Sequence, residues 1–175
     1  CGRHPEYYSE DPILTGTLMA YQARGLEENG VIATYKHLIA NNMEFERKSA
    51  HGIIDENTLR DLYLRVFDKA FSLYKPGCVM TSYNPVNGIY PCENSALLND
   101  LLRGEWGFDG FVMTDWGSYD TADSIRSVCA GTNLLTPGSK KHFRMILKAV
   151  KRNEISKAAL QHSVKQIVKV LVRCI

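Results

Sequence analysis

Short apolar runs alternate along the chain with longer segments whose apolar residues recur at helical spacing. The runs occupy residues 31–35, 78–82, 111–114 and 133–136, and apolar, partly β-branched sequences of this length are typical of buried strands. The helical segments occupy residues 12–29, 56–74, 95–106, 119–130, 140–152 and 156–173. This alternation predicts a parallel sheet with right-handed crossovers, which is the α/β class.

Local signals mark where several of these helices begin and end. Asp11 precedes Pro12, and Asp55 precedes the second helix, as capping residues do. Asn94 stands in the same relation to the third helix, and Gly30 follows the first. These signals support the helix limits given above.

The alternation fits two architectures, an open doubly wound sheet and part of a (β/α)8 barrel. A whole barrel needs about 250 residues, and this chain has 175, so a barrel here would be incomplete. No Ser/Gly-rich linker divides the chain, which is long enough for one domain with its own core. The pattern alone does not choose between the two architectures.

Polar and aromatic residues follow three of the predicted strands. Lys36-His37 follows the first run, Tyr83 the second, and Asp115-Trp116 the third. Because the carboxyl ends of parallel strands meet at one edge, these side chains are expected at a common mouth. Rings, a carboxylate and cations suit a polyhydroxylated ligand, since sugar C–H faces stack on aromatic rings and hydroxyl groups need polar partners. No phosphate-binding glycine motif follows a strand and no metal-ligand spacing occurs, so neither a nucleotide cofactor nor a metal is predicted.

Taken singly, these residues also have ordinary structural interpretations. Asp115 could cap the next helix, and Arg47 could pair with Glu44 or Glu46. The others could pack in the core or lie in solvent: Trp116, Tyr83, His37 and Lys36. Their joint placement at three strand ends favours a functional interpretation. A generic α/β enzyme, such as an aldolase with Lys36 as Schiff base, remains an alternative.

Composition argues against several classes of partner. The 21 basic and 19 acidic residues give a formal net charge of +2, so no strong field favours nucleic acid or an anionic membrane. No apolar run approaches the length that spans a bilayer. The polar residues 1–11 do not form a signal peptide. The five cysteines, odd in number and without a Cys-x-x-Cys pair, predict reduced, mostly buried thiols and slightly favour a cytoplasmic location.

An ordered set of segments carries a family resemblance. Residues 112–117, Val-Met-Thr-Asp-Trp-Gly, preceded by residues 102–110, are similar to the nucleophile signature of glycoside hydrolase family 3. Further segments resemble that family: residues 2–3 with 8–12, residues 34–37 with 41–42, residues 55–60 and residues 80–88. Any one would be weak, but the set runs in family order over nearly the whole chain and is therefore specific.

The resemblance implies a (β/α)8 TIM-barrel-like fold that is incomplete, with later strands and helices only, so that residues 1–175 form a single partial barrel domain. It implies a retaining glycosidase with Asp115 as nucleophile, kept ionised by Lys36 or Arg47 nearby. Trp116 would stack on the sugar, Tyr83 would lie close to the nucleophile, and Met80 would line the pocket. The residues implied to bind its hydroxyl groups are Arg3, Lys36, His37 and Arg47.

The second carboxyl group of a retaining mechanism remains unassigned. It must lie about 5–5.5 Å from the nucleophile to act as acid and then base. In most of the family it lies in a second domain after the barrel, which is absent here. Glu44, Glu93 and Glu105 are candidates by composition alone. The N-acetylhexosaminidase branch, which uses a histidine, is excluded because residues 36–42 lack its second histidine.

These expectations favour hydrolysis of terminal non-reducing β-D-glucosyl residues, with a β-glucoside or oligosaccharide as substrate. Residues 82–84 with 41–42 resemble β-glucosidases more than β-xylosidases, the alternative within the family. A non-catalytic sugar-binding or scaffold fragment is the second hypothesis, because the proton donor would be missing. Unpaired strand edges predict association with the remainder of the enzyme or a homo-oligomer. Relatives usually carry Asp and Met where this chain has Asn133 and Thr136, which questions the contacts of the last run.

Overall fold

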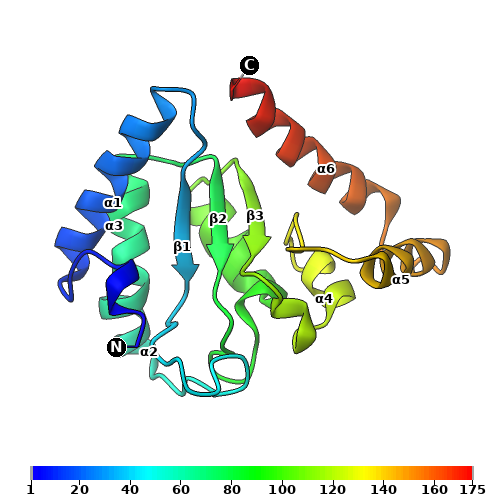
Figure 1. The fold of residues 1–175 in the computed structure, drawn as a ribbon, viewed down its shortest axis with the longest axis horizontal. Coiled ribbons are helices and arrows are strands. Elements are labelled where there is room, and N and C mark those ends of the chain that lie inside the picture. Colours follow the sequence, from blue (N-terminus) through cyan, green and yellow to red (C-terminus); the bar gives the residue numbers. More distant parts are fainter. Residues whose placement is uncertain (1, 175) are drawn as a thin grey trace.

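Three parallel strands form the centre of the computed structural model, which describes residues 2–174 (Figure 1). They are β1 (Thr34–Leu38), β2 (Cys78–Thr81) and β3 (Phe111–Thr114), and they lie side by side in that order. β2 and β3 pair in continuous register, with Cys78 opposite Phe111. The predicted α/β class with a parallel sheet is confirmed.

Helices precede, connect and follow the strands. The two crossovers are helical, as parallel strands require. The bounds are η1 (His4–Glu6), α1 (Pro12–Glu27), α2 (Glu56–Thr58), η2 (Leu59–Leu64), α3 (Arg65–Leu73), η3 (Pro91–Glu93), η4 (Ala96–Glu105), η5 (Ser118–Asp120), α4 (Ser124–Cys129), α5 (Lys140–Lys151), α6 (Lys157–Leu171) and η6 (Val172–Cys174). The predicted helix at residues 56–74 is thus one continuous segment, α2–η2–α3, whose middle is a π-helix.

The capping residues predicted from the sequence act as expected. The Asp11 carboxylate accepts hydrogen bonds from the first backbone N–H groups of α1, and Asp55 does the same for α2. Asn94 Oδ1 accepts from the N–H of Leu97 at 3.1 Å. Each cap satisfies backbone groups that a helix leaves unpaired at its start, so the start positions follow from local sequence.

Three predicted elements differ in position or type. β1 begins at Thr34 rather than residue 31 and runs on to Leu38, so Lys36 and His37 lie within the strand. The fourth run contributes one bridge, Leu134 opposite Met113, and no longer strand within the described residues. The helix expected at 119–130 is shorter, because Asp123 caps α4 at Ile125 and Arg126.

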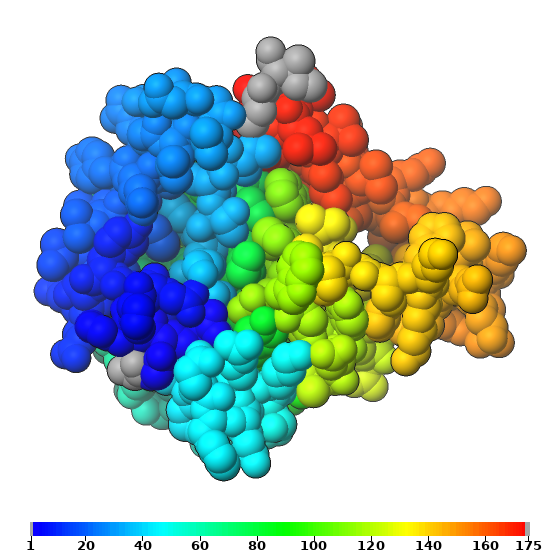
Figure 2. Space-filling view, in the orientation of Figure 1, coloured from blue at the N-terminus to red at the C-terminus, as the bar shows by residue number. Residues whose placement is uncertain are grey.

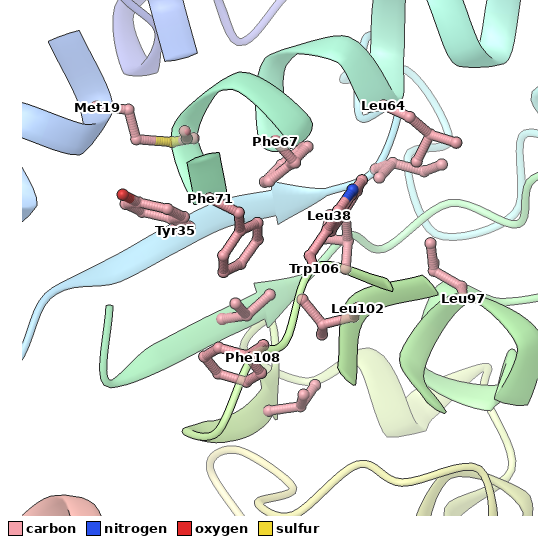
Figure 3. Packing of buried hydrophobic residues seen from close by; sticks show 14 of the residues in the cluster. Met19, Tyr35, Leu38, Leu64, Phe67, Phe71, Leu97, Leu102, Trp106 and Phe108 are labelled. Atoms are coloured by element: carbon pink, nitrogen blue, oxygen red, sulfur yellow. The ribbon is translucent and has the colours of Figure 1, made fainter. Parts of the chain in front are cut away.

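The main core lies between the sheet and helices α1, α3 and η4 (Figure 3). Tyr35 and Val79 from the strands pack there with Phe71 of α3 and Leu98 of η4. α1 approaches α3 closely at Gly16, where an added Cβ would lie 2.5 Å from a backbone oxygen of α3. This packing fixes β1, and with it the residues at its carboxyl end, against two helices.

A smaller cluster closes the amino end of the other sheet face. Val170 of α6 packs there against Cys78 and Phe111. Cys78 and Cys92 are buried free thiols and Cys129 is exposed, whereas the predictions for Cys1 and the thiol of Cys174 lie outside the described residues. Within residues 2–174, none of the helices has both the length and the apolar character needed to cross a bilayer.

Candidate active site

The predicted site residues collect where the parallel strands end. Asp115 directly follows β3, Tyr83 lies just beyond β2, and Lys36 and His37 lie near the end of β1. Arg3 reaches the same place from the N-terminal segment. All three strands point to one edge in Figure 1, and Figure 2 shows the loop after β1 (cyan) against the yellow-green chain after β3. The three strand ends therefore share one mouth.

Asp115 is a buried carboxylate, 8% exposed, whose two oxygens have different surroundings. Oδ1 accepts a hydrogen bond from the N–H of Trp116 at 2.7 Å. Oδ2 lies 3.4 Å from His37 Nε2 and 3.7 Å from Arg3 Nη2, and has no hydrogen-bond partner among residues 2–174. A buried carboxylate oxygen with unused lone pairs can serve as a nucleophile.

Arg3 and His37 form a buried pair beside Asp115. Arg3 Nη2 lies 2.9 Å from His37 Nε2, and His37 Nδ1 lies 2.9 Å from the hydroxyl of Tyr7. Because a guanidinium only donates, Nε2 must accept, and the imidazole proton is placed on Nδ1 facing Tyr7. Burial, with the charges of Arg3 and Lys36, lowers the pKa of His37 to about 4. The ring is therefore neutral at neutral pH.

Glu6 holds the cations of this site in place. Its carboxylate accepts from Lys36 Nζ and pairs with Arg3 Nη2 at 2.8 Å, and His37 Nε2 lies 3.7 Å away. Burial alone would raise the pKa of Glu6, but the hydrogen bond and charge of Lys36 and the charge of Arg3 lower it. The sequence interpretation missed Glu6, and its three-residue spacing from Arg3 was the available signal.

The cation closest to Asp115 is Arg3, which differs from the expectation that Lys36 or Arg47 would lie there. Lys36 is engaged by Glu6, and Arg47 by a carboxylate of its own loop. No local pattern indicates that the N-terminal segment folds back over the end of β1. The ion pair between Lys36 and Glu6 also argues against the Schiff-base alternative, which needs a free amine on Lys36.

Tyr83 lies beside Asp115 and anchors the chain that follows it. Its hydroxyl donates to the carbonyl oxygen of Trp116 at 2.6 Å, and the guanidinium of Arg47 lies 4.7 Å from its ring centre. Burial and the negative charge of Asp115 raise the pKa of Tyr83 to about 12. The hydroxyl therefore stays protonated and remains a donor.

Trp116 directly follows Asp115, and Met80 lies in β2. The side chain of Trp116 is 67% exposed, which leaves its indole accessible to a ligand. Met80 pairs with Met113 across β2 and β3, and alternation along β2 puts it on the face away from the helix-packed Val79. Neither residue belongs to the main core.

Two carboxylates share the guanidinium of Arg3 with Asp115. Glu6 pairs with it as described, and Glu44 accepts from Arg3 Nη1 at 3.1 Å and from Arg47 Nη1 at 2.9 Å. A carboxylate that accepts from two cationic side chains is a poor proton donor. Neither Glu6 nor Glu44 therefore suits the role of general acid.

The other two candidates from the sequence have different surroundings. Glu93 accepts from the backbone N–H of Asp123 at 2.6 Å, and Glu105 is the last residue of η4. Within the described part of the chain, no group of three or more His, Cys, Asp or Glu side chains is placed to hold a metal ion. The local chemistry is that of carboxylates, cations and aromatic rings.

A cavity of about 370 Å³ adjoins the site between η1, the end of β1 and helices α1 and α3. Lys36, His37 and Tyr7 line it together with Asn41. Asn41 is 2% exposed, and neither polar atom of its amide has a partner within residues 2–174. The volume lies in the range of small-molecule sites.

Comparison with known proteins gives a consistent result. The family model described as the glycosyl hydrolase family 3 N terminal domain matches residues 1–170. "Probable beta-glucosidase J" of Aspergillus fumigatus is 39% identical over 173 residues, covering 97% of this chain and 20% of that protein. "Thermostable beta-glucosidase B" of Acetivibrio thermocellus is 41% identical over 172 residues, covering 98% of this chain and 22% of that protein.

Solved structures show the same similarity. β-Glucosidase 3B from Thermotoga neapolitana in complex with glucose superposes with a TM-score of 0.93 at 40% identity, over 99% of this chain and 25% of that one. The Kluyveromyces marxianus β-glucosidase, also with glucose, gives 0.88 at 32% identity, over 96% and 20%. This chain thus spans about a fifth to a quarter of its relatives, and the predicted partial α/β domain is confirmed.

Proposed function

The chain belongs to glycosyl hydrolase family 3, and on that premise we propose that it serves the hydrolysis of terminal non-reducing β-D-glucosyl residues, with Asp115 as nucleophile. The relatives named above are β-glucosidases, and two of the solved structures carry glucose. The observation that supports the proposal most directly is the buried Asp115 carboxylate, which is oriented through one oxygen and has no hydrogen-bond partner at the other among residues 2–174.

The reaction would proceed by double displacement. Asp115 attacks the anomeric carbon, the bond from that carbon to the aglycone oxygen breaks, and a glycosyl ester forms on the carboxylate. The aglycone oxygen takes a proton from an acid. Water then attacks the same carbon, gives up a proton, and restores the carboxylate with overall retention. The ion pairs of Glu6 and Glu44 speak against either as that acid, so the proton must come from another group.

The charged groups around Asp115 would bind the sugar. Arg3, Lys36 and Arg47 can donate to ring hydroxyl groups, and neutral His37 can exchange its contact with Arg3 for one to a hydroxyl. Exposed indole rings stack on the C–H faces of sugars, which is the role proposed for Trp116, with Met80 lining the pocket.

A mechanism-based label tests the nucleophile without needing the missing acid. The 2-fluoro substituent slows both steps, and dinitrophenolate leaves without protonation, so 2,4-dinitrophenyl 2-deoxy-2-fluoro-β-D-glucoside should glycosylate the wild-type chain at Asp115. Peptide mass spectrometry locates the adduct. Asp115→Asn should reduce labelling by about 10³-fold or more while leaving the circular dichroism spectrum unchanged. The exposed Asp100→Asn serves as control and should label normally.

Labelling at another residue, or an undiminished rate in Asp115→Asn, would refute the assignment. The xylosyl analogue of the label tests the β-xylosidase alternative, which predicts faster labelling by xyloside than by glucoside. Glucose should also quench the emission of Trp116 in a Trp106→Phe background, because Trp106 is the second tryptophan and is buried. No quenching would argue against the stacking role.

The ion-paired state of Glu6 and Glu44 also favours a second candidate, sugar binding without turnover of unactivated substrates. This candidate predicts no hydrolysis of an alkyl glucoside by the chain alone, together with glucose-dependent thermal stabilisation. Hydrolysis of the alkyl glucoside by the chain alone would exclude it.

We further propose that residues 1–175 contribute part of one (β/α)8 barrel and associate through their strand edges. Among the described residues, β1 pairs with β2 alone, and β3 carries just one bridge beyond β2, to Leu134. Open parallel edges favour pairing with another chain. Sedimentation should therefore detect dimers or larger species, and a stable monomer would contradict this.

A further inference from the structure

Lys48 joins two loops at the edge of the candidate site. Its Nζ donates to the carbonyl oxygen of Gly117 at 3.0 Å and to Asp120 Oδ2 at 2.7 Å. The same ammonium lies 5.6 Å from the centre of the Tyr83 ring. The side chain therefore links the loop of residues 40–52 to the chain after β3, the two regions that touch in Figure 2.

The segment held in this way is the turn of residues 115–118, which carries the proposed nucleophile. The N–H of Trp116 orients Asp115 Oδ1, and the N–H of Ser118 donates to the Asp115 carbonyl at 3.1 Å. The N–H of Gly117 donates to the carbonyl of Thr136 at 2.8 Å. Because the carboxylate takes its orientation from the turn, a displacement of the turn moves the reactive oxygen.

Two side chains hold successive carbonyl groups of the turn. Tyr83 holds that of Trp116 at 2.6 Å, and Lys48 holds that of Gly117. Gly117 has φ +79°, a left-handed conformation that glycine enters and leaves at little cost. Backbone hydrogen bonds inside the turn run from the N–H of Ser118 to the Asp115 carbonyl and from the N–H of Asp120 to the Gly117 carbonyl, and the two side chains add external anchors to them.

We infer that Lys48 is a positioning residue, which holds the Gly117 carbonyl and thereby aligns Asp115 for attack on the anomeric carbon. The inference rests on the function proposed above. The side chain of Lys48 is 32% exposed and that of its partner Asp120 is 60% exposed. Exposed ion pairs contribute little to stability, so losing Lys48 should disturb alignment more than folding.

Substitutions at position 48 separate alignment from binding. Lys48→Met keeps a similar length and an apolar stem over Tyr83 but removes every donor. It should lower the limiting rate of Asp115 labelling by the fluoroglucoside about tenfold, with the half-saturating concentration changed less than about twofold. Lys48→Arg, which keeps charge and donors, should recover most of the rate. Arg24→Met removes an exposed ion pair on α1 and should change neither quantity.

Labelling of Lys48→Met at the wild-type rate, or failure of Lys48→Arg to recover the rate, would overturn the inference. If wild type is not labelled at all, the proposed function fails, and the positioning role is read from time-resolved anisotropy of Trp116 in the Trp106→Phe background. Lys48→Met should then increase the fast motion of the indole. Unchanged anisotropy would also overturn the inference.

Discussion

The two ends of the parallel sheet differ in whether their buried polar groups have hydrogen-bond partners. At the amino end, the Glu27 carboxylate accepts from the backbone N–H groups of Gly77 at 2.6 Å and Ala33 at 3.1 Å and from the hydroxyl of Tyr74 at 3.1 Å. At the carboxyl end, Asp115 Oδ2 lacks a hydrogen-bond partner among residues 2–174, and so do other buried polar atoms nearby: Arg3 Nε, both amide atoms of Asn41, Asn84 Oδ1 and Ser118 Oγ.

This difference separates the source of stability from the source of reactivity. A buried polar atom left without a partner costs about 1–3 kcal/mol, so the carboxyl end stores unfavourable free energy that a polar ligand can release. At the amino end, the Glu27 carboxylate is satisfied by three hydrogen bonds, so it stabilises the strands without this cost. The same division is expected for parallel barrels, in which activity lies at the carboxyl ends and stability at the amino ends.

The largest expected effect is at Glu27. Glu27→Ala removes the acceptor of three hydrogen bonds and leaves the N–H groups of buried Gly77 and Ala33 unpaired. We expect the free energy of unfolding to fall by about 3–4 kcal/mol. Urea denaturation followed by circular dichroism measures the change.

The neighbouring Glu28 provides a matched control. It forms an exposed ion pair with Arg24, and Glu28→Ala should cost no more than about 0.5 kcal/mol. Equal losses for Glu27→Ala and Glu28→Ala would mean that the amino-end network does not stabilise the sheet, and the comparison of the two ends would lose its basis.

The next largest effect is the pH dependence imposed by His37 at the carboxyl end. Its pKa is lowered from 6.5 to about 4 in the folded chain, by burial first and then by Arg3 and Lys36. As pH falls, the unfolded chain takes up this proton before the folded chain does, so stability is lost through the window from about 6.5 to 4 and is intact above it. We expect the free energy of unfolding to drop by about 2 kcal/mol between pH 7 and pH 5.

Removing the imidazole should remove that slope. His37→Gln should show little change in unfolding free energy between pH 7 and pH 5, whatever its absolute stability. His51→Gln, on an exposed loop, retains His37 and should keep the wild-type slope. A slope that persists in His37→Gln would assign the pH dependence to other groups.

Much of the fold could be predicted because its signals are local. Asp11 and Asp55 cap helices within three residues of themselves, and apolar runs alternate with helical segments in a way that requires parallel strands. The start of β1 was misplaced because its run begins with Val31, which is 53% exposed. The run at 133–136 has the pattern of a strand, but among the described residues it forms one bridge, at Leu134.

The part of the site that could be predicted is the set of polar and aromatic side chains at the carboxyl ends of the strands. Asp115 and Tyr83 are found there, close to His37, as the pattern indicates. The partners of these groups were not predictable, because Glu6 and Arg3 arrive from a segment whose path over β1 is set by tertiary packing. The spacing of residues along a chain indicates which of them lie on the same helix or strand, but it does not indicate which elements form ion pairs with one another.

The smallest effect sharpens the comparison from the amino end. Arg103 Nη2 donates to Asn133 Oδ1 at 2.9 Å, and Nη1 donates to the carbonyl of Gly110 at 3.0 Å, so a half-buried cation has two neutral acceptors. Burial lowers the pKa of Arg103, in spite of the opposing charge of Asp109. Asn133 Oδ1 also accepts from the N–H of Val112 at 2.6 Å, which places this contact at the start of β3.

Asn133→Asp would give Arg103 an anionic partner without changing side-chain size. The Ser163 hydroxyl, now 3.2 Å from the Asn133 amide nitrogen, can turn and donate to the new carboxylate. We expect stability to rise by about 1 kcal/mol at pH 7 and the gain to disappear as the carboxylate is protonated at low pH. Asn153→Asp, outside the strands and exposed, should give no gain. The rate of Asp115 labelling should stay the same, because the substitution changes the amino end and leaves the polar atoms at the carboxyl end as they are. A loss of stability in Asn133→Asp would show that the cost of desolvating the new charge outweighs the gain from its pairing.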